Sequence, residues 1–401
     1  MSIFAMVPLA AAQSSSSLSG VVTDSSGASI AGASVDVRDV NTGADRIAVT
    51  SPAGQYQVLS LPVGDYTITA RHAGFADQVR TGIHLAVGQE ATVNLQLGVG
   101  GVQQQITVNA DAAAVSLTTT DISGLVGEQQ VKDLPLNGRS YDELLTLDPG
   151  VVNFTAEKTG GVGVSNSTVG NNFSVSGNRP QQNLFLLNGI EFTGAAENNM
   201  QPGGTSQELL GVDAVREFNV LRDSYGAQYG KRPGAQVLIV TQGGANQVHG
   251  SAYEFLRNSA VDARNYFNKG AVPPFQRNQF GASLGGPIQR NKTFAFGNYE
   301  GFRQHLHQAG VALVPDANAR AGLLPCKLVT PTPNPCPPSG FVNVGVAPAV
   351  VPLLNLWPLP AADSPDFGGI AEVFNSPLQT IRDDFGTARI DRDFASHDTL
   401  T

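Results

Sequence analysis

The sequence predicts a mainly β protein, and three observations support this fold class. Only 14% of the 401 residues are charged, against roughly 25% in an average soluble domain, whereas 41% are hydrophobic. Much of the polarity therefore comes from uncharged residues. The 45 glycines and 24 prolines mark many turns. Between these turns lie short runs of Val, Ile, Thr and aromatic residues, which are typical of strands.

The charge and hydrophobicity of the chain exclude two classes of partner or anchor. The formal net charge is -9, and no cluster of Lys and Arg offers the concentrated positive patch that phosphate groups require. We therefore expect no nucleic acid partner. No stretch approaches the roughly 18 uninterrupted apolar residues of a membrane helix, so any membrane span must consist of β-strands.

Residues 1–13 have the character of a targeting segment. An apolar stretch from Ile3 to Ala12 ends in three alanines before Gln13, which fits a secretory cleavage site, although the basic start of a signal peptide is missing. We expect the remnant of a signal peptide. A disordered N-terminus is the alternative.

Residues 17–97 are predicted to form a compact β-sandwich. The stretches "SGVVTDSSGASIAGASVDV" and "GQYQVLSLPVGDYTITARHAGF" alternate apolar with polar residues between turns of Asp, Ser, Gly and Pro. These stretches resemble the carboxypeptidase regulatory-like domain, which implies a transthyretin-like β-sandwich. The chain has no His-x-x-Glu or His-Glu-x-x-His pair to hold zinc, so we expect no peptidase, metal or cofactor.

Residues 98–120 read as a linker that contains one β-prone patch. Glycines and glutamines lead into Ile106, Thr107 and Val108, which are followed by small residues. The backbone of such a patch can pair with another chain. It can equally be the last strand of the sandwich or an entry strand of the next domain, and the sequence leaves these readings open.

Residues 121–244 show a mixed α+β pattern. The stretch "VGEQQVKDLPLNGRSYDELLTLDPGV" predicts two short helices, the second with a capping box of Ser140 and Glu143. The stretch "NLFLLNGIEF" predicts a hairpin that turns at Asn188-Gly189. A short helix and a strand follow in "LLGVDAVREFNVL".

This order, continued by "YGAQYGKRPGAQVLIVTQGG", resembles the plug domain of TonB-dependent outer-membrane transporters where it runs into the first barrel strand, most closely in the Oar-like branch. Gly226, Gly230 and Gly234 are expected to allow tight turns, and Val237 to Val240 to form a buried strand. Gln242 is a departure, because this family often has a lysine there. It removes no strand-forming residue.

Residues 245–401 are expected to form the first strands of an outer-membrane β-barrel. In "FGASLGG", Phe280, Ala282 and Leu284 suit the lipid face, while the residues between them suit the lumen. The connection from about 308 to 380 is expected to be a long extracellular loop. Roughly four strands are readable, whereas such transporters close with about 22. The sequence is therefore expected to be a piece of a longer protein, with a complete short protein as the alternative.

Three further motifs were considered as chemical sites. "GASLG" matches the G-x-S-x-G elbow around Ser283, but "GPIQRNKT" follows where a helix should begin, so we expect no enzyme. His305 and His307 have no cysteine or carboxylate close in sequence, which favours loop histidines over a metal site. Cys326 and Cys336 are the only cysteines, and an even number in a secreted chain favours a disulfide.

The resemblance implies a transporter or receptor in the bacterial outer membrane, with the N-terminal sandwich in the periplasm. Its partners would be the TonB energy-transducing complex, outer-membrane lipid and a ligand that no residue identifies. By the same resemblance, the candidate TonB box comprises Ile106, Thr107, Val108, Asn109 and Ala110. The alternative is a surface adhesin or carbohydrate-binding protein that uses the sandwich.

Overall fold

The structure is a computed structural model. It describes residues 15–100, 105–109, 122–134, 136, 139–153, 171–192, 210–263, 272, 274–307, 310–333, 335–360, 364–375, 378–395 and 398–400. The chain divides into two compact units, of which the first comprises residues 1–254, 279–302 and 382–401, and the second residues 255–278 and 303–381. The expected signal peptide at residues 1–13 lies outside the described residues.

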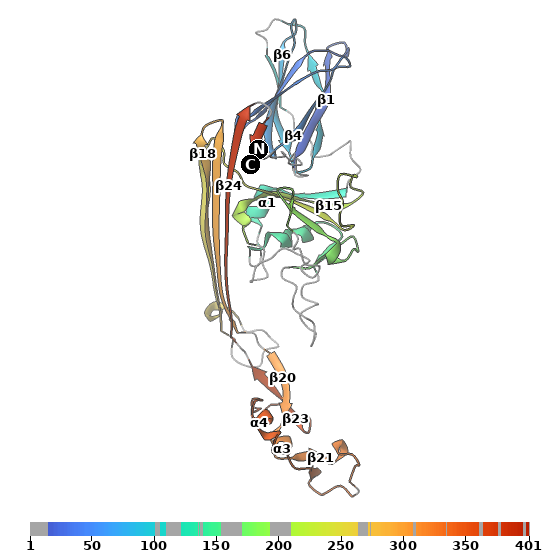
Figure 1. Ribbon diagram of the computed structural model, residues 1–401, viewed down its shortest axis with the longest axis vertical. Helices are drawn as coiled ribbons and strands as arrows, with labels where there is room; N and C mark the ends of the chain where they lie inside the picture. Colours follow the sequence, from blue (N-terminus) through green and yellow to red (C-terminus); the bar gives the residue numbers. More distant parts are fainter. Residues whose placement is uncertain are drawn as a thin grey trace, which may run out of the picture. The chain divides into compact units, whose positions relative to one another are not determined.

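The N-terminal part of the first unit is a sandwich of two β-sheets (Figure 1). One sheet has the order β4-β1-β7, with β8 also paired to β1, and the other has the order β3-β2-β5-β6-β9. The strands are β1 (Ser16–Asp24), β2 (Ser34–Asp39), β3 (Asp45–Val49), β4 (Gln55–Leu61), β5 (Gly64–Arg71), β6 (Asp77–Leu85), β7 (Glu90–Thr92), β8 (Leu95–Leu97) and β9 (Gln105–Asn109). We call residues 15–100 the sandwich.

Alternating side chains from both sheets fill the core of the sandwich. Buried and exposed residues alternate along β1, β2, β4 and β5, as expected where one face of each sheet packs inward. Two tyrosines in this core keep their hydroxyl groups satisfied, because Tyr56 donates to the carbonyl of Val93 and Tyr66 to that of Pro62. The predicted sandwich is therefore confirmed.

The central domain is built on a five-stranded sheet of order β10-β15-β16-β13-β14. Its strands are β10 (Ile122–Val126), β13 (Leu184–Leu187), β14 (Ile190–Glu191), β15 (Val215–Asp223) and β16 (Gln236–Thr241). A second pair, β11 (Val151–Asn153) with β12 (Phe173–Val175), and four short helices accompany it: α1 (Glu128–Asp133), η2 (Tyr141–Leu147), η3 (Pro180–Gln182) and η4 (Val212–Ala214). The predicted α+β pattern is confirmed.

Two sequence-predicted features of the central sheet are present as expected. Asn188 and Gly189 join β13 to β14 with φ angles of 49° and 80°, the left-handed pair that a two-residue hairpin turn requires. Strand β16 is buried from Gln236 to Val240, because it lies between β15 and β13 in the middle of the sheet.

The predicted capping box at Ser140 is wrong. Ser140 does stand at the N-cap of η2, but its side chain caps no backbone amide. Its hydroxyl instead donates to the buried carboxylate of Asp142, to which Asn171 also donates at 3.1 and 3.2 Å. Burial raises the pKa of Asp142 from 3.8 to about 6. A nearby carboxylate therefore competes with the helix for the serine.

Turns are present at two of the three glycines before β16, where the carbonyls of Gly226 and Gly230 accept from the amides of Tyr229 and Arg232 at 3.1 and 2.8 Å. None of Gly226, Gly230 and Gly234 is among the glycines with positive φ, whereas Lys231, within the same turn, has a φ of 68°. Gly234 is needed for a different reason. A Cβ there would lie 2.6 Å from the backbone of Gln182, so the residue permits close approach of two chain segments rather than a reversal.

The remaining long strands form an open sheet of order β17-β18-β19-β24-β25, which we call the wall (Figure 1). Its strands are β17 (His249–Asn258), β18 (Phe275–Gln289), β19 (Thr293–His307), β24 (Leu378–Ala395) and β25 (Asp398–Leu400). Phe280, Ala282 and Leu284 are exposed, as predicted, while Gly281 and Ser283 are partly covered. The described strands do not form a closed barrel.

Buried and less buried residues alternate along much of strand β19. Phe294, Phe296, Asn298, Glu300 and Phe302 share one face and are all buried. The inward face of this strand therefore carries aromatic side chains, so polarity alone does not separate the two faces.

The second unit contains secondary structure where the sequence predicted only a long loop. Its described elements include the strand pairs β20 (Gly310–Pro315) with β23 (Ile370–Asn375) and β21 (Leu323–Pro325) with β22 (Phe341–Asn343), and the helices α3 (Ala317–Arg320) and α4 (Val351–Leu354). Cys326 and Cys336 form a disulfide with a Cα–Cα distance of 6.0 Å. Among the described helices, none is both long and apolar enough to cross a membrane.

Candidate functional site

The candidate TonB box lies on the edge of the sandwich. Strand β9 contains Ile106, Thr107, Val108 and Asn109, while Ala110 lies outside the described residues. The strand runs parallel to β6, with Asp77 opposite Gln105 and Thr81 opposite Asn109. It is the last strand in the order of its sheet. The structure therefore shows β9 as an added strand of the sandwich, one of the readings that the sequence left open.

The turn that follows β6 packs against a cluster of apolar side chains in the central domain. The side chains of Val63 and Val87 from the sandwich are buried against central-domain residues from β13, β15 and β16. Those residues are Leu184, Leu186, Leu221, Leu238 and Val240, flanked by Tyr225 and Tyr229. We call this cluster, together with Glu217 and Asn219, the socket.

Polar groups hold the same turn by its backbone. The carboxylate of Glu217, almost fully buried on β15, accepts a hydrogen bond of 2.5 Å from the amide of Val87. The side chain of Asn219 donates to the carbonyl of Val87 at 3.3 Å. Both backbone groups of Val87 are thus bonded to the neighbouring domain. Because a buried polar group costs free energy when it is unpaired, these two hydrogen bonds favour one position of the turn against the central domain.

His84 adds a charge to the socket. Its Nε2 lies 3.5 Å from the Glu217 carboxylate, and its Nδ1 lies 2.9 Å from that of Asp65. The interaction with Glu217, together with that of Asp65, raises the pKa of His84 from 6.5 to about 9 in spite of partial burial. His84 therefore carries a positive charge at neutral pH.

This shift predicts a pH dependence of stability. A raised folded-state pKa gives a stabilising contribution that is complete below pH 6.5 and is lost as the pH rises through about 9. The denaturant midpoint should therefore fall between pH 6 and pH 9.5 by more in the wild-type protein than in His84→Gln. Equal falls in the two proteins would show that His84 contributes no such linkage.

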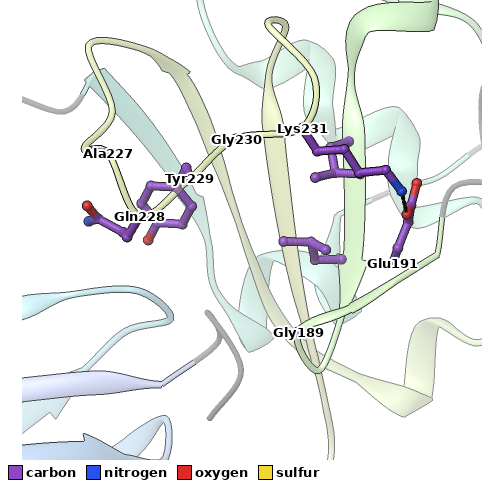
Figure 2. A pocket seen from close by; sticks show the side chains of 9 residues that line it. Gly189, Glu191, Ala227, Gln228, Tyr229, Gly230 and Lys231 are labelled. Carbon is purple, nitrogen blue, oxygen red and sulfur yellow. Dashed lines mark hydrogen bonds and ion pairs between the residues drawn. The ribbon is translucent and has the colours of Figure 1, made fainter. Parts of the chain in front are cut away.

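A pocket of about 380 Å³ opens beside the socket (Figure 2). Its lining includes Leu184, Leu186 and Tyr229, which also belong to the socket. Lys231 and Glu191 form an ion pair at this pocket, as Figure 2 shows. The charge of the lysine is therefore already matched, and the pocket continues the apolar surface on which the sandwich packs.

A second set of contacts joins the central domain to the wall. Glu300 on β19 is fully buried, and its carboxylate accepts from the amide of Gly211 at 2.8 Å and from the side chain of Gln279 at 2.5 Å. Gly211 has a φ of 100°, and a Cβ there would lie 2.3 Å from the ring of Phe385 on β24. Only glycine fits this position.

An ion pair extends these contacts between the central domain and the wall toward β17. We call the two sets of contacts the seam. Arg139 and Asp213 of the central domain are 2.7 Å apart and mostly buried. The second oxygen of Asp213 accepts from the hydroxyl of Ser251 on β17 at 3.0 Å, and the Arg139 guanidinium lies 4.2 Å from the ring centre of Tyr253. The central domain is therefore anchored to the wall by hydrogen bonds as well as by packing.

The residues considered for catalysis or metal binding do not assemble a site. Ser283 lies within β18, which continues as a strand to Gln289, so the turn into a helix that a nucleophile elbow needs is missing. Its hydroxyl is 2.9 Å from that of Ser251. His305 lies 3.4 Å from the hydroxyl of Thr380. Within the described part of the chain, His, Cys, Asp and Glu residues form no group of three suited to a metal, and this includes His305 and His307.

The sequence prediction missed the socket and the seam, although one signal was present. Glu217 and Asn219 are two residues apart on β15, so both point to the same face, which also carries the buried Leu221. Glu300 is likewise a polar residue on a buried strand face, the face of β19 that carries the buried phenylalanines. A polar residue on an otherwise apolar strand face indicates a polar partner from outside the sheet.

Comparison with known families matches three successive parts of the chain. Residues 17–98 match the carboxypeptidase regulatory-like domain, residues 114–235 the TonB-dependent receptor plug domain, and residues 240–401 an outer membrane beta barrel domain. The plug domain belongs to receptors and the Oar relative described below is a transporter, so the family is one of transporters and receptors. They indicate the outer membrane as the location, with the sandwich in the periplasm.

Individual proteins are similar over smaller parts. The TonB-dependent transporter Oar of Myxococcus xanthus is 23% identical over 303 residues, which is 72% of this chain and 27% of that protein. The siderophore receptor PirA from Acinetobacter baumannii is 19% identical, over 48% of this chain and 28% of that chain, with a TM-score of 0.34. The Bacillus anthracis TIE protein is 22% identical, over 21% of this chain and 17% of that chain, with a TM-score of 0.19. With its regulatory-like, plug and barrel domains in this order, the chain belongs to the TonB-dependent transporters of the outer membrane.

Proposed function

We propose that this protein takes up or exports a ligand across the outer membrane by energy coupling to TonB, and that β9 is the strand to which TonB binds. The position of β9 carries the proposal. It is a short strand that lies at the edge of a sheet and precedes the central domain in the chain. An edge strand presents backbone groups to which an extended segment of a partner can add.

The coupling mechanism that we propose is backbone pairing. A segment of TonB adds to β9 as a further strand, so β propensity at Ile106, Thr107 and Val108 matters more than side-chain identity. The central domain acts as the plug, and its contacts with the wall at Glu300 and Asp213 keep the path closed until TonB pulls. The Oar relative is named as a TonB-dependent transporter, which supports this reading.

Proline in β9 is expected to abolish TonB binding. Proline has no backbone amide hydrogen to donate and restricts the residue before it, so Thr107→Pro and Val108→Pro should interrupt the strand. The measurement is binding of the purified carboxyl-terminal domain of TonB to the full-length protein in detergent. We expect at least a tenfold loss of affinity in both variants.

Ala112→Pro, in the same linker but outside β9, is the matched control and should bind TonB as the wild-type protein does. All variants must first reach the outer membrane at normal levels. Wild-type affinity in both Thr107→Pro and Val108→Pro would rule out β9 as the coupling segment.

A further inference from the structure

We propose that the sandwich transmits the pull of TonB to the plug, so that force applied at β9 reaches the central sheet through β6 and the socket before it reaches the plug along the chain. This inference rests on the proposed function of β9 as the coupling strand. It assigns a mechanical role to the sandwich, for which no role has been given so far.

The first step is that one strand joins β9 to the socket. Residues Asp77 to Thr81 of β6 pair with the whole of β9. The same strand ends at Leu85, and Val87, whose side chain is 0% exposed, enters the socket two residues later. The path from β9 to the central domain therefore crosses a single sheet pairing and then follows a continuous backbone.

The second step concerns the direction of the pairing. Strands β6 and β9 run parallel and in register over five residue pairs. In a parallel pair the inter-strand hydrogen bonds are evenly spaced, so a pull along the strands stretches all of them together rather than one after another. Such a pairing resists separation better than one that opens from an end.

The third step is that TonB need not displace β6. Strand β9 has β6 on one side and stands at the end of the sheet order. A partner strand can therefore add to its outer edge while the sandwich keeps hold of the inner edge. The sandwich then remains part of the path when TonB pulls.

The socket is built to carry this force. Val87 is held through its side chain, its amide and its carbonyl, by the apolar cluster, by Glu217 and by Asn219 respectively. The next residue, Gly88, packs closely against Tyr229, since a Cβ at this position would lie 3.0 Å from the tyrosine hydroxyl. Glu217 and Asn219 both lie on β15, which pairs with β10 and β16, so force at the socket enters an inner strand of the central sheet.

The direct path along the chain is longer. Between the end of β9 and the start of β10 lie about 12 residues, which can span up to about 40 Å when fully extended. We propose that the socket bears the pull before this connection is fully extended.

The test is force spectroscopy on the full-length protein in lipid bilayers, with the purified carboxyl-terminal domain of TonB attached to the probe. In the wild-type protein we expect an early force peak, when the socket opens, followed by an extension of no more than about 40 Å before the plug begins to unravel. In Val87→Asp, which places a carboxylate in the apolar cluster beside Glu217, the early peak should fall at least twofold.

Three further variants distinguish the socket from its alternatives. Val49→Asp, at a valine on β3 that is 66% exposed, is the matched control and should keep the early peak. An oxidised disulfide between Val79→Cys and Thr107→Cys, which are register partners on β6 and β9, should also leave it unchanged. Glu217→Ala replaces Val87→Asp if the latter fails to assemble, and the same twofold loss is expected.

The results that would overturn the inference can be stated in advance. No early peak in the wild-type protein, or a peak that survives both Val87→Asp and Glu217→Ala, would overturn the inference. A peak that the disulfide strengthens would show that β9 leaves β6 first, which also overturns it. Thr107→Pro and Val108→Pro report on the proposed function separately, because continued attachment of TonB in both variants would exclude β9 as the coupling strand whatever the socket does.

Discussion

Replacing Glu300 with alanine is expected to loosen the contact between plug and wall by about 1–3 kcal/mol, the cost of leaving one buried donor without its acceptor. The change removes the acceptor of the Gly211 amide, which belongs to the plug, and also that of Gln279 within the wall. Hydrogen exchange of the full-length protein, read by mass spectrometry, should show faster exchange in residues 210–218.

The matched control for this prediction is Glu254→Ala, because Glu254 is an exposed glutamate on β17. It should leave exchange in residues 210–218 at the wild-type rate. Glu300→Gln, which keeps one acceptor oxygen, should show an intermediate rate. Wild-type exchange in Glu300→Ala would mean that packing alone seats the plug.

Truncation of Phe218 is expected to have a comparable effect on the plug itself. This side chain is 1% exposed, lies in the core of the central domain and packs against Tyr141 with ring centres 6.2 Å apart. Phe218→Ala should lower the free energy of unfolding by about 3–5 kcal/mol, through lost burial and the cavity that remains.

The measurement is guanidinium unfolding of the full-length protein, followed by hydrogen exchange in peptides of β15 and β16. Leu147→Ala, at a leucine of the same domain that is more than half exposed, should change the unfolding of these strands by less than about 0.5 kcal/mol. Similar effects of the two substitutions would argue against a tightly packed plug core.

Local features of the fold were predictable from the sequence because they depend on neighbouring residues. The Asn188-Gly189 turn follows from its requirement for two positive φ angles. The exposed face of β18 follows from the alternation of Phe280, Ala282 and Leu284. Both signals act within a few residues, and no distant segment competes with them.

The features that could not be predicted depend on groups far away in the sequence. The distant Asn171 donates to the carboxylate of Asp142, the group that accepts the hydroxyl of Ser140. Gly234 is needed because Gln182 passes close by. The socket joins Val87 to residues more than a hundred positions later, and nothing near Val87 in the sequence indicates that partner.

The pairing of β9 with β6 has a further consequence for the folding of the protein in a crowded compartment. Without β9, residues 77–81 of β6 would be an open sheet edge, and open edges invite unrelated extended chains to join them and aggregate. Because β9 follows the sandwich by only a few residues along the chain, it reaches that edge at a high effective concentration. The pairing thus covers this part of β6 and limits the open edge of the sheet there to the five residues of β9.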